Sequence, residues 1–550
     1  MRTKGSDLLV AALENEGVER IFGLPGEENL AVVEALRASK IELILTRHEQ
    51  AASFMAATQG RLTGAPGVCL STLGPGALNF TTGAAYAYLG AMPMVMITGQ
   101  KAIKSARQAR FQLVDIVGAM RPITKLTRQI VSADAIPSMV RDAFRVATEE
   151  RPGPVHLELP EDIAAEEASA SLIAPHPILR PIPSPVAVKS AVELILAARR
   201  PLIMIGAAGN RPRLVEALSD FVRRTQIPFF NTQMGKGAVT GNSELYLGTA
   251  ALSERDYIHG AIEHADLIIA IGHDTIEKPP FLMGASGGPK VVYVGYASAT
   301  VEQVFHPDAE VIGDIGATVT ALADALHQRV NAPAEFMTLR DDIRGHLGER
   351  AEDERFPVIP QRLVHDVRKV MPEDGIVCLD NGMYKIWFAR NYRTTVANTL
   401  LLDNALATMG AGLPSAITAK CLNPGKRVLA VCGDGGFMMN SQELETAVRL
   451  KLDLVVLIVE DFAYGMIRWK QAVDHFADFG MTFGNPDFVR YATSYGAHGH
   501  LIAAASDLVP TLEAAFSQGG VHLVAVPIDY SENMRVLVEE LGNRTLEQPA

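Results

Sequence analysis

Two aspartates, each shortly after an apolar run, are well placed in this chain to bind a metal ion. The run Val428–Cys432 leads into Asp434 within the segment GDGG, and the run Leu454–Val459 leads into Asp461. We interpret the two runs as parallel strands joined by a helix, so both aspartates should lie at one edge of a sheet, where α/β proteins bind ligands. Two carboxylates suit a hard cation such as Mg²⁺. The glycines would let main-chain N–H groups approach a phosphate.

A simpler interpretation of the same residues is a tight turn with an Asx cap, followed by an unrelated acidic loop. Under either interpretation we expect Gly433–Gly436 to form a tight turn, with Asn440 and Glu443 as a capping box for a helix that ends near Leu450. The spacing favours the metal site, because a strand–helix–strand unit occupies about 30 residues and the two aspartates are 27 residues apart.

Short apolar runs alternate with helical patterns along the whole chain, which predicts an α/β fold. Several runs are continuous rather than alternating in polarity, as expected for strands of parallel sheets that helices cover on both faces. The clearest runs are Val68–Ser71, Met94–Thr98, Leu202–Gly206, Leu267–Gly272, Val291–Gly295, Val428–Cys432, Leu454–Val459 and Leu523–Pro527.

Two stretches interrupt this rhythm and are predicted to be linkers. Residues 166–187 are rich in Pro, Ser and Ala, and residues 337–360 combine a charged helical pattern with the sequence FPVIP. They divide the chain into predicted domains at 1–165, 188–336 and 355–540, each with a mainly parallel sheet flanked by helices. We expect the central domain to be mainly structural.

Composition narrows the range of functions. Of the 550 residues, 48% are hydrophobic and 20% charged, which is typical of a packed protein. The net charge of −12 comes without a basic patch, which argues against nucleic acid as a partner. No apolar run approaches the roughly 20 residues that span a bilayer, and we interpret the N-terminus as a capped helix rather than a signal peptide. Cys69, Cys378 and Cys432 lie in apolar runs, so we expect buried free thiols and a cytoplasmic protein.

The segment from GDGG to Asp461 resembles the thiamine diphosphate (ThDP) and Mg²⁺ motif of ThDP-dependent enzymes. Many members end this motif with two asparagines, whereas this chain has Glu460-Asp461; some catabolic acetolactate synthases are similar in having an aspartate at the second position. The resemblance implies a metal ion on Asp434, Asp461 and the main-chain carbonyl of Ala463. It also implies a cofactor beside Gly435, Gly436 and Tyr464.

The N-terminal part carries further similarity to acetolactate and acetohydroxyacid synthases. RHEQAASFMA resembles their HE-x-x-A-x-x-MA pattern, which implies that Glu49 hydrogen bonds the pyrimidine ring of ThDP and favours the imino form that deprotonates its C2 carbon. STLGPGALN resembles the loop beside that ring and implies Pro75 and Asn79 as its lining. The FQ-x-x-D segment implies that Phe111 and Gln112 lie near the substrate.

Each of these residues also has a simpler interpretation. Glu49 could only complement a helix N-terminus, Phe111 could be a core aromatic, and His48 could only cap or solvate the helix.

In the last third, LDNGMYKIWFARNY resembles the family's loop that reaches the diphosphate, with Gly382, Met383 and Tyr384 at the matching positions. NALATMGAGLPSAI implies that Met409 is the apolar wedge that bends ThDP and brings its 4′-imino nitrogen to C2. The alternative for Met409 is a gap-filling core residue.

The substrate side of this region matches less well. Met466 corresponds to a recurrent apolar position, but Trp469 and Lys470 depart from the patterns of both biosynthetic and catabolic synthases. Lys470 could face solvent or contact a substrate carboxylate.

The middle of the chain does not resemble the FAD-binding members. LIMIGAAGN lacks a complete GxGxxG. Where those members carry an Arg-rich run, this chain reads AIGHDTIEKPP, with His273, Asp274 and Glu277. We therefore expect no FAD.

Taken together, the resemblance is to a catabolic, FAD-independent acetolactate synthase. It implies that pyruvate is decarboxylated and that the hydroxyethyl carbanion adds to a second pyruvate, giving 2-acetolactate and CO₂. It also implies a site formed between two chains, hence a homodimer at least and plausibly a homotetramer. Three alternatives stay open: a ThDP-dependent 2-oxoacid decarboxylase or a carboligase with another acceptor, a flavin-dependent oxidase, and a non-catalytic ThDP-binding paralogue.

Overall fold

The structure, a computed structural model, describes residues 3–104, 110–252, 256–277, 288–300, 306–326 and 333–540. Within these residues the chain forms three six-stranded sheets, and every strand pairing inside them is parallel. The predicted α/β class is thereby confirmed. The residues group into two compact units, each described here by itself: Met1–Leu179 with Leu413–Pro424 and Asn440–Leu452, and Arg180–Gly412 with Gly425–Met439 and Asp453–Ala550.

The first unit contains a sheet with the strand order β3-β2-β4-β5-β7-β6. Its strands are β2 (Arg20–Gly23), β3 (Glu42–Leu45), β4 (Gly67–Ser71), β5 (Met94–Gln100), β6 (Leu126–Gln129) and β7 (Pro154–Pro160). Its helices are α1 (Gly5–Asn15), α2 (Leu30–Arg37), α3 (Glu49–Thr63), α4 (Gly74–Asn79), α5 (Thr81–Leu89), α6 (Ile116–Met120), α7 (Ile136–Thr148) and α8 (Glu161–Ala165). The short strands β1 (Thr3–Lys4) and β8 (Glu167–Ala168) pair antiparallel.

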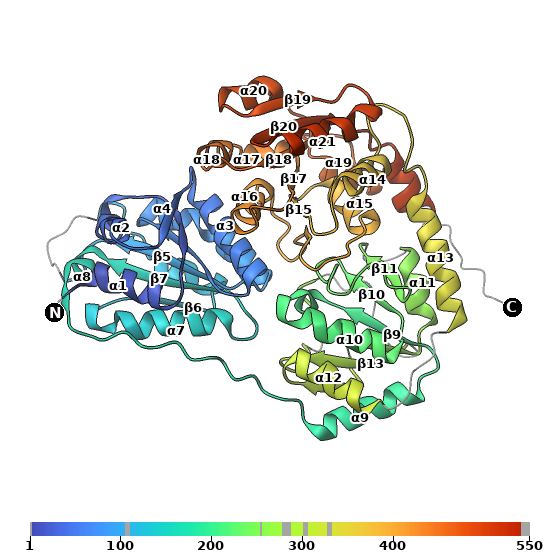
Figure 1. The fold of residues 1–550 in the computed structure, drawn as a ribbon, viewed down its shortest axis with the longest axis horizontal. Helices are drawn as coiled ribbons and strands as arrows, with labels where there is room; N and C mark the ends of the chain where they lie inside the picture. The colour runs from blue at the N-terminus through green and yellow to red at the C-terminus, as the bar shows by residue number, and fades with distance from the viewer. Residues whose placement is uncertain are drawn as a thin grey trace. The chain divides into compact units, whose positions relative to one another are not determined.

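Helices cover both faces of this sheet. Val68 and Leu70 of β4 belong to the core that α1, α2 and α7 share, and α1 and α7 lie side by side (Figure 1). Cys69, which points to the opposite face, is also fully buried, and α3 packs against the same strand. Burial on both faces explains why these strands are continuous apolar runs in the sequence.

The helix α3 is fixed at both ends by local sequence signals. At its start, Nδ1 of His48 accepts a hydrogen bond of 3.0 Å from the Gln50 N–H, so the interpretation of His48 as a capping residue is confirmed. At its end, Gly64 adopts the left-handed conformation (φ 75°) and donates to the Gly60 carbonyl. Glu49 is therefore the first residue of α3, and it lies shortly after the carboxyl end of strand β3.

The second unit contains two sheets. The middle sheet has the order β11-β10-β9-β12-β13-β14 and the other has the order β16-β15-β17-β18-β20-β19. The middle elements are α9 (Pro185–Ala197), β9 (Pro201–Ile205), α10 (Val215–Thr225), β10 (Phe229–Thr232), β11 (Tyr246–Ala250), α11 (Tyr257–His264), β12 (Leu267–Ile271), β13 (Lys290–Gly295), β14 (Ala309–Ile312), α12 (Ile315–Ala325) and α13 (Ala334–Gly348).

The later elements follow from residue 360. They are α14 (Pro360–Val370), β15 (Ile376–Leu379), α15 (Met383–Asn391), β16 (Leu400–Leu401), β17 (Val428–Gly433), α17 (Asp434–Met439), β18 (Leu454–Glu460), α19 (Gly465–Val473), α20 (Phe488–Ser494), β19 (His498–Leu501), α21 (Leu508–Gln518), β20 (Val521–Pro527), α22 (Glu532–Met534) and a π-helix (Arg535–Glu540). Two helices from this stretch of sequence belong to the first unit: α16 (Gly412–Leu422), from Leu413 on, and α18 (Glu443–Arg449).

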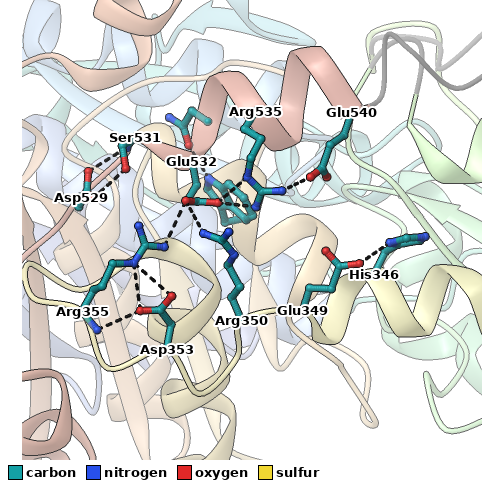
Figure 2. Close-up of polar contacts among 12 residues, drawn as sticks. His346, Glu349, Arg350, Asp353, Arg355, Asp529, Ser531, Glu532, Arg535 and Glu540 are labelled. Atoms are coloured by element: carbon teal, nitrogen blue, oxygen red, sulfur yellow. Dashed lines mark hydrogen bonds and ion pairs between the residues drawn. The ribbon is translucent and has the colours of Figure 1, made fainter.

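The carboxylate of Glu532 connects the segment after α13 to the C-terminal helices through hydrogen bonds. Glu532 accepts hydrogen bonds from Arg350 (2.6 Å), Arg355 (3.1 Å) and Arg535 (2.9 Å), as Figure 2 shows. Burial alone would raise the pKa of Glu532, but the bonds from Arg535 and Arg355 hold that pKa below its usual value. The network joins a stretch predicted to be a linker to α22 and the π-helix that follows it. The domain boundaries proposed from the sequence stay predictions.

All eight apolar runs interpreted as strands are confirmed, within one or two residues at each end. Two local expectations are wrong. Gly433–Gly436 does not form a free turn, because β17 extends through Gly433 and α17 begins at Asp434. The capping box is not formed either: Gln442 is the capping position of α18, and the Glu443 side chain is used in contacts distant in sequence.

The four cysteines are free, and Cys69, Cys378 and Cys432 are buried, as expected. Among the described residues, no helix combines the length and the apolar character needed to cross a membrane.

Candidate functional site

A pocket lies at the carboxyl ends of the strands of the last sheet, in the second unit. In the register of the two central strands, Gly433 of β17 pairs with Val459 of β18, so the segments that follow these strands emerge side by side. The pocket is lined by Asn381, Gly382, Met383, Tyr384, Met409, Gly433, Asp434, Gly435, Gly436, Val459, Asp461, Ala463, Tyr464, Gly465, Met466, Ile467 and Tyr530. The structure thus brings together the residues that were proposed from the sequence to contact the diphosphate, to bind the metal and to bend the cofactor.

The glycines of the GDGG segment are required by close neighbours. A Cβ atom on Gly436 would lie 2.8 Å from the Asp380 carboxylate, and one on Gly435 would lie 3.0 Å from the Phe483 ring. Gly435 and Gly436 belong to the first turn of α17, and the first N–H groups of a helix have no partner within that helix. The Gly435 N–H donates to Oδ1 of the neighbouring Asp434 (2.8 Å), so this glycine cradle at the start of the helix combines main-chain N–H groups with a carboxylate that could hold a metal.

Asp434, which is buried, and Asp461, which is half-buried, form an acidic pair at the start of this cradle. Asp434 is 1% exposed, and its Oδ2 accepts hydrogen bonds of 2.8 Å from both the Phe462 N–H and the Asn485 amide. Burial and, to a lesser degree, the neighbouring Asp434 carboxylate raise the pKa of Asp461 to about 7. A divalent cation between the two carboxylates would offset this repulsion, so the donor set fits a metal such as Mg²⁺.

The third proposed metal ligand lies on a strained segment. Phe462 adopts a left-handed conformation (φ 56°), which is unusual for a residue with a bulky side chain. Ala463 next to it is buried and forms an antiparallel bridge with Thr482. In the described part of the chain, no cluster of three or more His, Cys, Asp or Glu side chains could hold a metal. A site here would therefore use the two aspartates with main-chain oxygen, as the resemblance implies.

The loop that carries Met409 is held by Asp380, a residue that the sequence analysis did not select. Asp380 is 1% exposed and accepts hydrogen bonds from the Asn381 N–H (2.7 Å) and the Gly410 N–H (2.9 and 3.0 Å). Burial raises the pKa of Asp380 to about 6, against the effect of main-chain hydrogen bonds from residues 381, 410, 411 and 412. The sequence contained a usable signal, because Asp380 directly follows the strand Ile376–Leu379.

Two tyrosines complete the wall of the pocket. The Tyr384 hydroxyl accepts a hydrogen bond of 2.9 Å from the Gly433 N–H, which ties α15 to the end of β17. Burial raises the pKa of Tyr530 well above its usual value, and Asp461 and Asp434 raise it further. Tyr530, in the segment VPIDYSENM, is a further residue that the sequence analysis did not select.

Asn485 is the residue that sequence reasoning could least have found. Its amide donates to Asp434 (2.8 Å) and to Glu460 (3.2 Å), although it lies 51 residues after Asp434 in a segment without helix or strand. No motif or spacing connects the two residues, so only the fold brings them together.

In the first unit, Glu49 and Asn79 form a second set of polar contacts. The Asn79 amide donates a hydrogen bond of 2.9 Å to Oε2 of Glu49. A Cβ atom on Gly76 would lie 3.1 Å from Oε1 of Glu49, so the glycine leaves room for this carboxylate. Pro75 stands in the first turn of α4, immediately before Gly76.

Phe111 and Gln112 lie just beyond residues 105–109, which are outside the described residues. Phe111 is 67% exposed, so the alternative that it is a core aromatic is wrong. Gln112 adopts a φ of 57°, and its carbonyl oxygen would lie 2.8 Å from a Cβ atom on Gly74. The structure therefore brings Gln112 to the start of α4, while Phe111 is open to solvent in this chain.

Of the three proposed substrate residues on α19, only Met466 lines the pocket. Trp469 is half-buried against the core, and Lys470 is exposed, with its ammonium 4.7 Å from the centre of the Trp469 ring. The structure does not bring Trp469 or Lys470 into the pocket lining, and a role for them in substrate binding stays a prediction.

Comparison with known families and proteins agrees with this geometry. Residues 3–119 match "Thiamine pyrophosphate enzyme, N-terminal TPP binding domain", residues 188–322 match the central domain, and residues 380–526 match the C-terminal TPP binding domain. Thiamine pyrophosphate is another name for ThDP.

The chain is similar over nearly its whole length to several proteins. It is 32% identical to "Acetolactate synthase" of Bacillus subtilis (strain 168), over 98% of this chain and 96% of that protein. It is 36% identical to "Acetolactate synthase, catabolic" of Raoultella terrigena, over 96% of each chain, and 31% identical to "Acetolactate synthase isozyme 2 large subunit" of Escherichia coli (strain K12), over 97% of each. The chain therefore belongs to the thiamine diphosphate-dependent enzymes, where it is an enzyme of the carboligase type close to the acetolactate synthases.

Proposed function

We propose that this enzyme joins two molecules of pyruvate into 2-acetolactate with release of one CO₂, using ThDP and Mg²⁺. The observation that carries the proposal is the pocket at the β17 and β18 strand ends, which collects Asp434, Asp461 and Met409 around a glycine cradle. Bound ThDP would supply the nucleophilic carbon and accept the electron pair that is released when CO₂ leaves.

The chain's own residues would bind and orient this cofactor. Asp434, Asp461 and the Ala463 carbonyl would hold Mg²⁺, and the first turn of α17, with Gly435 and Gly436, would face the diphosphate. Met409 would support the bent cofactor from a loop whose main-chain N–H groups are fixed by Asp380. A fixed loop at this point lowers the cost of reaching the reactive geometry.

Glu49 would hold and exchange the proton on the pyrimidine ring. Its Oε2 is already occupied by the Asn79 amide, which orients the carboxylate and leaves Oε1 beside the small Gly76. A glutamate fixed in this way can hydrogen bond a ring nitrogen without first reorganising.

Following the resemblance, we propose that the working enzyme is at least a homodimer.

We further propose that the middle sheet binds no FAD. Glu277, which is 3% exposed, accepts hydrogen bonds from the Ala207 N–H (2.9 Å), the Met234 N–H (3.2 Å) and the Thr232 hydroxyl (2.6 Å). Ala207 follows β9 and Met234 follows β10, so this carboxylate occupies main-chain donors at the strand ends where a dinucleotide phosphate would bind. We expect colourless protein.

The experiment is a product analysis with pyruvate, ThDP and Mg²⁺. We expect 2-acetolactate as the product, and we expect Glu49→Gln to lose about 100-fold or more in rate. The matched control is Glu42→Gln, at an exposed position of the preceding strand β3. Acetaldehyde as the sole product would instead identify a decarboxylase, the alternative that the unusual residues Trp469 and Lys470 suggest. Full activity of Glu49→Gln would contradict the proposed role of Glu49.

A further inference from the structure

A buried glutamate contacts the main chain immediately before Glu49. Glu443, the first residue of α18, is fully buried within the first unit. The Arg47 N–H donates to both of its carboxylate oxygens, at 3.0 and 3.2 Å, and the His48 N–H donates to the carboxylate as well. The Thr446 hydroxyl donates a further bond of 2.7 Å.

Two neighbours of Glu443 hold the same stretch of chain at its two ends. The Asn440 amide donates to Oε1 of Gln50 (3.1 Å), and the Arg449 guanidinium donates to the Leu45 carbonyl (2.5 Å). Residues 45–50 are thus contacted from one side at three points, and Glu49 lies inside this stretch.

These contacts set the direction in which the chain enters α3. Arg47 and His48 are the last residues before the helix, and His48 has extended backbone angles (φ −150°, ψ 142°) as its capping residue. A change at these two residues would redirect the first turn of α3, where the Glu49 side chain begins. Because catalytic groups tolerate little misplacement, control of this turn bears directly on the function of Glu49.

A carboxylate is a costly choice for this position if its role is only to fill space. Burial raises the pKa of Glu443 to about 7, which means that the ionised form is disfavoured there. An uncharged side chain would avoid this cost, but few side chains can accept two main-chain N–H groups and a hydroxyl together.

We propose that Glu443 is a positioning residue for Glu49: it holds the Arg47 and His48 main chain so that the Glu49 carboxylate is oriented for the cofactor's pyrimidine ring. This inference rests on the function proposed above. It also links the helix that follows the GDGG segment in sequence to the glutamate that activates the cofactor.

The test uses two variants of the full-length protein, Glu443→Ala and Glu443→Gln. The second is included because glutamine keeps one acceptor oxygen, so this variant should fold more readily than Glu443→Ala. The matched control is Glu34→Gln on α2 of the same unit, where the exposed carboxylate pairs with Arg37. Amide hydrogen exchange of residues 46–50 is measured without cofactor. The hydrogen–deuterium exchange of the ThDP C2 proton and the dissociation constant of ThDP are measured with cofactor.

We expect Glu443→Ala to speed amide exchange at residues 46–50 and to slow C2 exchange by about 100-fold, with a change of less than about threefold in the ThDP dissociation constant. Glu443→Gln should lie between Glu443→Ala and wild type, and Glu34→Gln should match wild type. If amide exchange rises while C2 exchange keeps its wild-type rate, Glu443 is only structural and the proposal is wrong. It is also wrong if amide exchange at 46–50 is the same in all variants.

A failure of the proposed function has a different signature. In that case Glu49→Gln itself would leave C2 exchange unchanged, whatever Glu443 does to the amides.

Discussion

The burial of Asp461 beside Asp434 predicts that the proposed metal site destabilises the metal-free protein. Burial and the neighbouring carboxylate raise the pKa of Asp461 from 3.8 to about 7. Between these two pH values the folded chain binds a proton that the unfolded chain does not, so stability falls as the pH rises. Each pH unit corresponds to about 1.4 kcal/mol, and ionised Asp461 therefore costs about 4 kcal/mol at pH 8.

The perturbation is Asp461→Asn, which removes the charge and keeps an oxygen for the Ala463 N–H. At pH 8, with metal ions removed by a chelator, we expect the variant to have a higher free energy of unfolding than wild type, by as much as about 4 kcal/mol. The difference should shrink as the pH falls from 7 towards 4, because wild-type Asp461 is then protonated in the folded state. The assay is urea unfolding at fixed protein concentration, with Asp474→Asn at an exposed position as the control.

Magnesium should narrow this difference. At 100 times its dissociation constant, a ligand that binds only the folded chain adds about 2.7 kcal/mol, and wild type should gain this while Asp461→Asn does not. A variant that is less stable than wild type at pH 8 without metal would refute this reasoning. So would a stabilisation by Mg²⁺ that is equal in both proteins.

Three further predictions follow from single contacts. His156 is fully buried between the Thr98 and Thr127 hydroxyls (2.8 Å each), and burial lowers its pKa from 6.5 to about 3. Its contribution to stability is therefore lost as the pH falls from 6.5 towards 3, by about 3 kcal/mol at pH 4, and His156→Gln should flatten this part of the stability–pH curve in urea unfolding. Asn485→Ala should weaken Mg²⁺ binding by about 10- to 100-fold in calorimetry, because it removes a hydrogen bond to Asp434. Glu532→Ala should lower the free energy of unfolding by about 2 kcal/mol in denaturant titration, because Glu532 collects the arginines shown in Figure 2; equal stability of this variant and wild type would show that the network is not stabilising.

The strands were predictable because of their environment. Runs such as Leu454–Val459 lie in sheets that helices cover on both faces, so nearly every position must be apolar. The pairing of Asp434 with Asp461 was predictable for a related reason, since parallel neighbours joined by one helix place their carboxyl ends together.

The local details around these residues were harder to predict. The glycines of GDGG indicated a turn, but the first turn of a helix tolerates glycine, and α17 begins at Asp434. Glu443 has the spacing of a capping residue relative to Asn440, yet its partner Arg47 lies 396 residues away. Asn485 carries no local signal at all, because its role depends on the path of a loop. Contacts of this kind are decided by tertiary packing, which pairs residues without regard to their separation in sequence.

The measurement that tests the central claim most directly is the ratio of pyruvate consumed to CO₂ released by the wild-type enzyme with ThDP and Mg²⁺. Joining two pyruvates into 2-acetolactate requires two pyruvates for each CO₂, and we predict this ratio. Simple decarboxylation would release one CO₂ for each pyruvate, and a ratio of one to one would contradict the account.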